Sequence, residues 1–279
     1  GYGSDEEQFA RPWPATHIVG KDIRRFHAVI WPAMLMAAGI EVPNEVFAHG
    51  WLLVGGEKMS KSKLTGIAPA EIIDVFGSDA FRSYFMSAIA FGQDGSFSWE
   101  DLAARYQAEL ANGFGNLASR TTAMIERYYE GIVPPAGAET EADLEIQRIV
   151  RDAAANADAA IDRLAIDEAV SAIWTIVDAL NGYITANEPW ALAKDDAQRE
   201  RLGTVLYTAA EGLRALAVLL SPVIPKACEK LWIALGAAET LGRLLDQPIR
   251  QAGEWGQLKP GTSVNGLAPL FPRVESTVD

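Results

Sequence analysis

The chain has 279 residues, with 24 Lys and Arg against 37 Asp and Glu, and therefore a formal net charge of −13. This charge excludes a protein that coats polyanions through many neutralised phosphates, so any nucleic-acid contact has to be local. The apolar fraction of 49% excludes a wholly disordered chain. The single cysteine, Cys228, excludes a disulfide framework and a multi-cysteine zinc site within the chain. It also fits a reducing, cytoplasmic location.

The first residues are polar and acidic and include no initiator methionine. We therefore expect no signal peptide, and we expect the chain to be a fragment of a longer protein. No run of about 18 apolar residues is present, so we expect no membrane span.

The first part of the chain reads as a strand, a helix and a second strand. Residues 16–20 form a short apolar run that ends in glycine, and Asp22 can then cap a helix that runs to about Ala38 and stops at Gly39. Residues 46–54 read as a second strand. This order predicts a right-handed crossover within a parallel sheet.

After residue 64 the apolar pattern becomes helical, so the predicted fold is mostly α. Pro69 starts one helix, Ser78 and Asp79 cap the next, residues 92–95 form a turn, and Ser98 caps a long helix over 99–129. Residues 101–200 carry 8 basic and 18 acidic side chains and are rich in alanine, which is typical of exposed helices. Further helices are predicted after a linker at 134–137, over 140–163, 167–187, 195–220 and 225–235.

The most informative string is Lys58-Met59-Ser60-Lys61-Ser62, which follows the second predicted strand and two glycines. Lysines on a loop at the carboxyl end of a parallel strand are suited to phosphate, because each supplies a movable positive charge. The plainer interpretation is a solvated basic loop, which composition alone favours by roughly four to one.

The string resembles the signature loop of class I aminoacyl-tRNA synthetases. That resemblance implies that the loop stabilises the ATP phosphates during adenylate formation, with Lys58 and Lys61 as the catalytic lysines and Lys61 carrying most of the effect. Other strings resemble the methionyl-tRNA synthetase family in particular, and they lie in order at 17–23, 26–27, 31–35, 48–52, 116–120 and 187–190.

The resemblance also implies a division of the chain. Residues 1–65 would be the C-terminal part of a Rossmann-type α/β catalytic domain with short parallel strands, and 66–98 a connecting helical segment like a stem-contact fold. Residues 99–241 would form an α-helical anticodon-binding bundle, on which the Pro- and Gly-rich tail 242–279 packs.

Ile23, His27 and Trp31 follow one another at intervals of four residues, which places them within an arc of ~80° on a regular helix. Such a face suits an apolar, polarisable side chain, because a thioether sulfur is favourable beside aromatic edges. Spacing alone favours ordinary core residues by about three to one. The resemblance instead implies that these three residues line the methionine site.

Gly20 and Asp22 flank the turn from the first strand into the helix. A carboxylate there can accept hydrogen bonds from ribose hydroxyls or cap the helix, and the two roles can coexist. The resemblance implies that Gly20 and Asp22 contact the ribose of ATP and that His49, Gly50 and Leu52 border the adenine. His49 can alternatively be a structural partner of the lysine loop.

Asn116 and Arg120 lie one turn apart on the long predicted helix, and Pro189-Trp190 follows the end of another. Without the family, a surface pair and a packing tryptophan are each favoured by roughly three to one. The resemblance implies that Asn116, Arg120, Pro189 and Trp190 read the anticodon of methionine tRNA, CAU. Unpaired bases stack on aromatic rings and are hydrogen-bonded at their edges.

The implied activity is a methionine–tRNA ligase that uses ATP with Mg²⁺, methionine and methionine tRNA, with no zinc expected in this chain. The second ATP signature of class I enzymes, His-Ile-Gly-His, is absent from the sequence, so we expect the chain to be inactive alone, and we expect a monomer. The alternatives are a synthetase for isoleucine, valine, leucine or cysteine, or a free-standing tRNA-binding module without catalysis. His27 with Trp31, and Asn116 with Arg120, speak against another amino acid.

Overall fold

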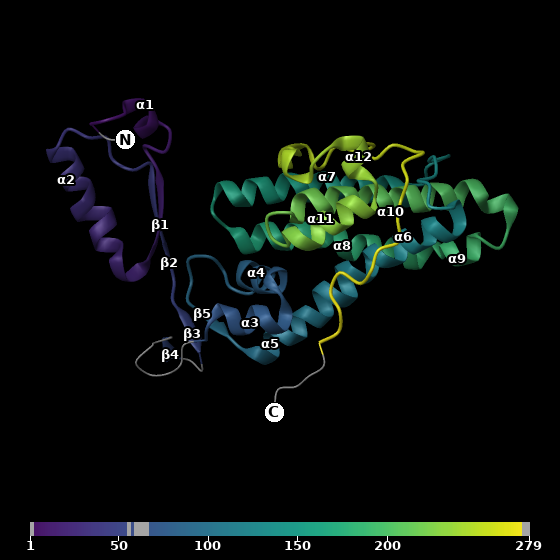
Figure 1. Ribbon diagram of the computed structural model, residues 1–279, viewed down its shortest axis with the longest axis horizontal. Helices are drawn as coiled ribbons and strands as arrows, with labels where there is room; N and C mark the ends of the chain where they lie inside the picture. Colours follow the sequence, from purple (N-terminus) through teal and green to yellow (C-terminus); the bar gives the residue numbers. More distant parts are fainter. Residues whose placement is uncertain (1–2, 55–56, 59–66, 275–279) are drawn as a thin grey trace. The chain divides into compact units, whose positions relative to one another are not determined.

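The computed structural model describes residues 3–54, 57–58 and 67–274. The chain forms two compact units: unit 1 is Gly1–Gly66 with Ile89–Ser98, and unit 2 is Ile67–Ala88 with Trp99–Asp279. Unit 1 contains the short strands, and unit 2 is built mainly from helices (Figure 1). The predicted fold class, mostly helical with short parallel strands near the start, is confirmed.

Unit 1 contains the predicted strand, helix and strand. After helix α1 (Glu6–Ala10), strand β1 (Thr16–Gly20) pairs in parallel with β2 (Glu45–His49), so that Gly20 lies opposite His49. Three helical turns of different pitch connect the strands: the 3₁₀ turn η1 (Lys21–Ile23), the π turn η2 (Phe26–Ile30) and helix α2 (Trp31–Ala37). Gly39 follows with a φ of +69°, as expected of a helix stop.

The prediction of a single helix capped by Asp22 was wrong in two respects. Pro32 has no N–H to donate to an earlier turn, and the backbone N–H of Trp31 reaches back to the carbonyl of Phe26, which is the π pattern. The residue at the N-cap position is Gly20, and Asp22 lies inside the 3₁₀ turn without capping it. The Asp22 carboxylate instead accepts a hydrogen bond from the indole N–H of Trp51.

The prediction of a single strand over 46–54 was also wrong. β2 ends at His49, and β3 (Leu52–Val54) belongs to a second sheet, antiparallel to β4 (Glu57–Lys58) and parallel to β5 (Gly95–Phe97). The chain breaks at Gly50, where a Cβ atom would lie 2.0 Å from the carbonyl oxygen of Gln93. Only glycine fits there, and the turn predicted at 92–95 leads directly into β5.

Unit 2 is organised around helix α10, in which every residue from 202 to 220 is buried. It packs against α6, α7, α8 and α11, and Figure 1 shows these helices side by side. Within the described ranges, Asp196–Leu220 is the one segment long and apolar enough to cross a membrane, and its apolar stretch is wholly buried. It is therefore the core helix of the unit. The helices of unit 2 are α3 (Pro69–Phe76), α4 (Ser78–Ser87), α5 (Trp99–Arg105), the π stretch η4 (Tyr106–Gly115), α6 (Asn116–Tyr129), α7 (Glu141–Asp162), α8 (Ile166–Asn187), α9 (Pro189–Leu192), η5 (Asp196–Gln198), α10 (Arg199–Leu220), α11 (Pro225–Ala234), α12 (Ala237–Leu241), η6 (Leu244–Asp246) and η7 (Ile249–Gln251).

The predicted helices of this unit are present, although the one predicted over 99–129 contains the π stretch η4, and the predicted cap of α4 was wrong. Gly77, with a φ of +85°, is the N-cap residue, and no side chain caps this helix. The buried carboxylate of Asp79 instead accepts a hydrogen bond of 2.7 Å from the backbone N–H of Ala227, in the first turn of α11. Asp79 therefore connects α4 to α11, which lies far away in the sequence, and does not cap α4.

Two charged residues buried in α10, Glu211 and Arg214, hold the tail segment 252–258. Arg214 pairs with Glu211 at 3.0 Å and donates to the backbone carbonyls of residues 252 and 254. The Glu211 carboxylate accepts three backbone N–H groups, from Gly256, Gln257 and Leu258. Burial raises the pKa of Glu211, while Arg214 and these N–H groups oppose that shift.

Candidate functional site

The carboxyl ends of β1 and β2 form an edge of unit 1 where several predicted site residues meet. In a parallel pair both strands end on the same side, which is where ligands bind in open α/β sheets. Gly20 and His49 end these strands as partners, and a Cβ atom on Gly20 would lie 3.8 Å from Cε1 of the His49 ring. Asp22 and Gly50 follow directly in the chain.

Trp51 connects the two sides of this edge. Its indole N–H donates to Oδ1 of Asp22 at 2.7 Å, and its backbone N–H donates to Oδ1 of Asp94 at 2.8 Å. The ammonium of Lys21 lies 3.8 Å from the centre of the Trp51 ring and bonds both oxygens of Asp94, at 2.5 and 2.7 Å. The hydrogen bond from Lys21, followed by that from the Trp51 backbone, lowers the pKa of Asp94.

Lys21, Trp51 and Asp94 were missed by the sequence analysis. Lys21 and Trp51 adjoin the predicted residues Asp22 and Gly50 within the matched strings, so their positions carried a usable signal. Asp94 lies in a glycine-flanked turn, where aspartate is common for local reasons, and nothing in the sequence pointed to its partners.

His49 has contacts of a structural kind. Nδ1 donates to the carbonyl of Gly50 at 2.8 Å. The ring stacks near Phe91 with centroids 6.5 Å apart, and Phe91 stacks on Phe47 at 4.7 Å. Leu52 lies in β3 rather than in a continuation of β2. The His49 ring is thus held by its neighbours in unit 1.

The lysine string can be followed only in part. The backbone of Lys58 pairs with Leu53 between β4 and β3. Lys61 and the remainder of the string fall in residues 59–66, outside the described residues.

Ile23, His27 and Trp31 lie on the helical segment between β1 and β2. In this chain Ile23 and Trp31 are 45% and 39% exposed. Nδ1 of His27 lies 3.2 Å from the carbonyl oxygen of Ile23, and the His27 ring meets that of His17 edge-on at 6.0 Å. The π turn changes the rotation per residue, so the predicted arc of ~80° does not describe this segment.

In unit 2 the structure brings together the two strings that were predicted to read an anticodon. The guanidinium of Arg120 lies over the ring of Trp190 at 5.7 Å, a cation–π distance, although the residues are far apart in the chain. Trp190 is 38% exposed and Pro189 beside it is buried. Asn116 is exposed one turn before Arg120 on α6.

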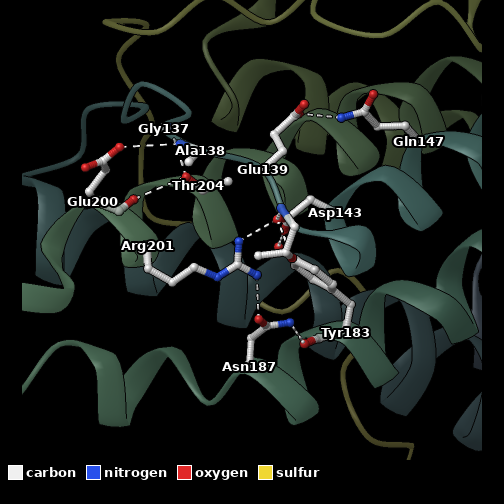
Figure 2. A network of polar contacts seen from close by, with 11 residues as sticks. Gly137, Ala138, Glu139, Asp143, Gln147, Tyr183, Asn187, Glu200, Arg201 and Thr204 are labelled. Carbon is white, nitrogen blue, oxygen red and sulfur yellow. Dashed lines mark hydrogen bonds and ion pairs between the residues drawn. The ribbon is translucent and has the colours of Figure 1, made fainter.

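A buried polar network lies next to these residues, and Figure 2 shows its central members. The carboxylate of Asp143 accepts hydrogen bonds from the Tyr183 hydroxyl, from the backbone N–H of Thr140 at 2.6 Å and from Nη1 of Arg201. Nη2 of Arg201 donates to the amide oxygen of Asn187 at 2.6 Å. No pattern in the sequence predicted this network.

The described residues contain no group of three or more His, Cys, Asp or Glu side chains that could hold a metal ion. Cys228 is fully buried, and burial raises the pKa of its thiol. A buried thiol with a raised pKa is a packing residue rather than a nucleophile.

Comparison with known proteins gives matches along nearly the whole chain. Residues 2–122 match the family model for class I tRNA synthetases (M), and residues 133–277 match the model for the anticodon-binding domain of methionyl-tRNA ligase. The methionine–tRNA ligase of Streptomyces coelicolor is 53% identical over 279 residues, which cover 99% of this chain and 52% of that protein. The ligase of Thermotoga maritima is 38% identical over 278 residues, or 99% of this chain and 43% of that protein.

Solved structures of Mycobacterium tuberculosis methionyl-tRNA synthetase match as well. The apo form has a TM-score of 0.87 at 35% identity, over 98% of this chain and 52% of that chain. The form bound by methionyl-adenylate has a TM-score of 0.88 at 36% identity, over 98% and 53%. This chain thus spans about half the length of these relatives. It belongs to the methionyl-tRNA synthetase family, and it combines a segment of the class I catalytic domain with the anticodon-binding domain.

Proposed function

We propose that this chain is part of a methionine–tRNA ligase. In the first step a carboxylate oxygen of methionine bonds to the α-phosphorus of ATP, and the bond to pyrophosphate breaks. In the second step a ribose hydroxyl of the terminal adenosine of methionine tRNA attacks the activated carbonyl, and AMP leaves. Mg²⁺ enters with ATP as part of the substrate, and positioning with charge stabilisation supplies the catalysis.

The edge formed by β1 and β2 is the proposed place of the adenylate. Gly20 and Asp22 would hold the ribose and the loop from His49 to Leu52 would border the adenine, while Lys58 and Lys61 would stabilise the phosphates. Ile23, His27 and Trp31 would receive the methionine side chain. The support is that Gly20 and His49, which are proposed to contact the ribose and the adenine, meet at one strand edge, and that a relative of the same fold binds methionyl-adenylate.

Asn116, Arg120, Pro189 and Trp190 are the proposed anticodon readers. The observation that carries this proposal is the position of Arg120 over the half-exposed ring of Trp190. An indole with a guanidinium beside its ring offers a stacking surface and edge donors, which is how unpaired bases are recognised.

Unit 1 leaves large apolar side chains exposed, among them Phe26 at 63%, Met34 at 61% and Met36 at 72%. Clustered exposed apolar residues mark a surface that another part of a protein covers. We infer that the remainder of the catalytic domain covers them, and that this chain alone does not catalyse ATP–pyrophosphate exchange.

Residues 66–98 would connect the catalytic segment to the bundle. The complete enzyme would be a cytoplasmic monomer.

A pair of variants in the longer protein tests the two assignments together. Lys61→Ala should slow methionine-dependent ATP–pyrophosphate exchange by about 100-fold or more, because a charge opposite the leaving phosphates is lost, while methionine affinity stays. Trp190→Ala should weaken charging of methionine tRNA and leave exchange intact.

The exposed Lys230→Ala variant is the control for loss of a lysine. An unchanged exchange rate in Lys61→Ala would rule out its phosphate role. Loss of both activities in Trp190→Ala would assign Trp190 to folding instead of recognition.

A further inference from the structure

Trp190 stands on a short element that cannot fix its own position. Helix α9 has only four residues, Pro189–Leu192, and isolated helical turns of this length are unstable. Glu188, the residue before it, adopts the left-handed conformation with a φ of +43°, which ends α8 directly before α9. The direction of the indole therefore depends on what holds the last turn of α8, in addition to the packing of α9 against α10.

Asn187 is the last residue of α8, and both the nitrogen and the oxygen of its side-chain amide are hydrogen-bonded. Nδ2 donates to the carbonyl of Tyr183 at 2.9 Å, and Oδ1 accepts from Nη2 of Arg201 at 2.6 Å (Figure 2). Arg201 belongs to α10, the core helix, and α9 also packs against α10. Asn187 thus ties the turn before Trp190 to the most buried helix of the unit.

The other arm of Arg201 is anchored on a buried charge. Nη1 donates to Oδ2 of Asp143, whose side chain is fully buried and also accepts from Thr140 and Tyr183. Burial raises the pKa of Asp143, but these hydrogen bonds outweigh it and leave the pKa at about 2. The carboxylate is therefore charged near neutral pH, and it fixes the plane of the guanidinium.

Only a guanidinium can make both contacts at once. Its two terminal nitrogens form a rigid planar fork, whereas a lysine ammonium is a single point charge. Arg201 therefore does more than neutralise Asp143, because it transmits the position of that carboxylate to Asn187, three residues before Trp190.

We propose that Asn187 and Arg201 are positioning residues for the Trp190 indole, and that they determine how tightly the chain binds an unpaired anticodon base stacked on that ring. This inference rests on the proposed reading of the anticodon by Trp190. The simpler alternative is that the network only stabilises the helical unit.

The test uses the 279-residue chain and a short RNA hairpin with a CAU anticodon loop. Asn187→Ala and Arg201→Lys should each weaken hairpin binding about tenfold, and Arg201→Lys should do so while keeping a positive charge beside Asp143. Thr185→Ala is the matched control, because Thr185 lies on α8 and donates to the carbonyl four residues back, as Asn187 does, but is exposed and outside the network. Its affinity should equal that of the parent chain.

A second readout separates positioning from stability. The chain labelled with 5-fluorotryptophan gives a ¹⁹F resonance for Trp190, assigned by its loss in Trp190→Phe. Asn187→Ala and Arg201→Lys should shift or broaden that resonance at temperatures where urea titrations show all variants folded, and Thr185→Ala should leave it in place. An unchanged Trp190 resonance with unchanged affinity in both variants would overturn the proposal, as would an equal effect of Thr185→Ala. If the parent chain itself ignores the CAU hairpin, the proposed function fails, whereas the fluorine spectra still decide the positioning.

Discussion

Tryptophan side chains provide the fixed surfaces of both candidate sites. Trp51 donates its indole N–H to Asp22 and carries Lys21 on its face, while Trp190 lies under Arg120. An indole offers a large rigid area with one polar atom, and at Trp51 that atom donates a hydrogen bond to Asp22.

Removal of the Trp51 N–H should release Asp22. Trp51→Phe keeps an aromatic ring for Lys21 but loses the 2.7 Å hydrogen bond. In the longer protein we expect the KM for ATP to rise about fivefold, which corresponds to about 1 kcal/mol for one hydrogen bond, with little change in kcat. Steady-state exchange kinetics at varied ATP would measure this.

Trp13→Phe is the matched control. It also removes one indole hydrogen bond in unit 1, at 2.9 Å, but to the backbone carbonyl of Glu41. A similar KM change in both variants would mean that Trp51 acts on unit 1 as a whole and not on Asp22.

The sequence predicted which residues lie close together where they stood in a recognisable string, and it did so poorly elsewhere. Gly20, Asp22 and His49 lie at one edge because parallel pairing follows from the predicted crossover. Asp94 and Asp143 gave no such signal, because their roles depend on partners 43 and 58 residues away. An aspartate in a turn or in the first turn of a helix already has a sufficient local reason to be there.

At the scale of elements, the helices were easier to predict than the strands. Helices α7, α8 and α10 each have 22 residues, long enough to show a helical apolar period and end signals. β3 and β5 have three residues each, too few to show alternation. The break at Gly50 depends on the approach of Gln93, a tertiary contact that no local pattern contains.

The junction of α7, α8 and α10 should show a specific pH dependence. The pKa of Asp143 is about 2 in the folded chain, below the value of about 3.9 expected when unfolded. A lowered pKa stabilises the fold above the unfolded value, and this stabilisation is lost as the pH falls from about 4 to about 2. Asp143→Asn should therefore be less stable by about 3 kcal/mol at pH 6, as expected for breaking a buried ion pair.

The difference in unfolding free energy between the two proteins should shrink below pH 4, as measured by urea titrations followed by circular dichroism. Asp152→Asn, which alters an exposed carboxylate on the same helix, controls for the loss of one acidic group. A difference that stays constant from pH 6 to pH 2 would contradict a charged Asp143 in the fold.

At the scale of the whole molecule, the charge of −13 and a role in tRNA recognition are compatible. The acidic excess lies mainly in residues 101–200, yet Arg120 stands in that part of the chain at the surface expected to read bases. A strongly acidic chain repels RNA in general and binds it through a few placed contacts. We therefore expect discrimination between anticodons rather than high affinity for any RNA.

The most direct test of the account compares two RNA hairpins that differ only in the first anticodon base, CAU and UAU, in binding to the 279-residue chain at physiological salt. The CAU hairpin should bind at least about tenfold more tightly, since one correctly read base edge contributes about 1–3 kcal/mol. Equal affinity for the two hairpins would contradict the claim that this chain reads the methionine anticodon.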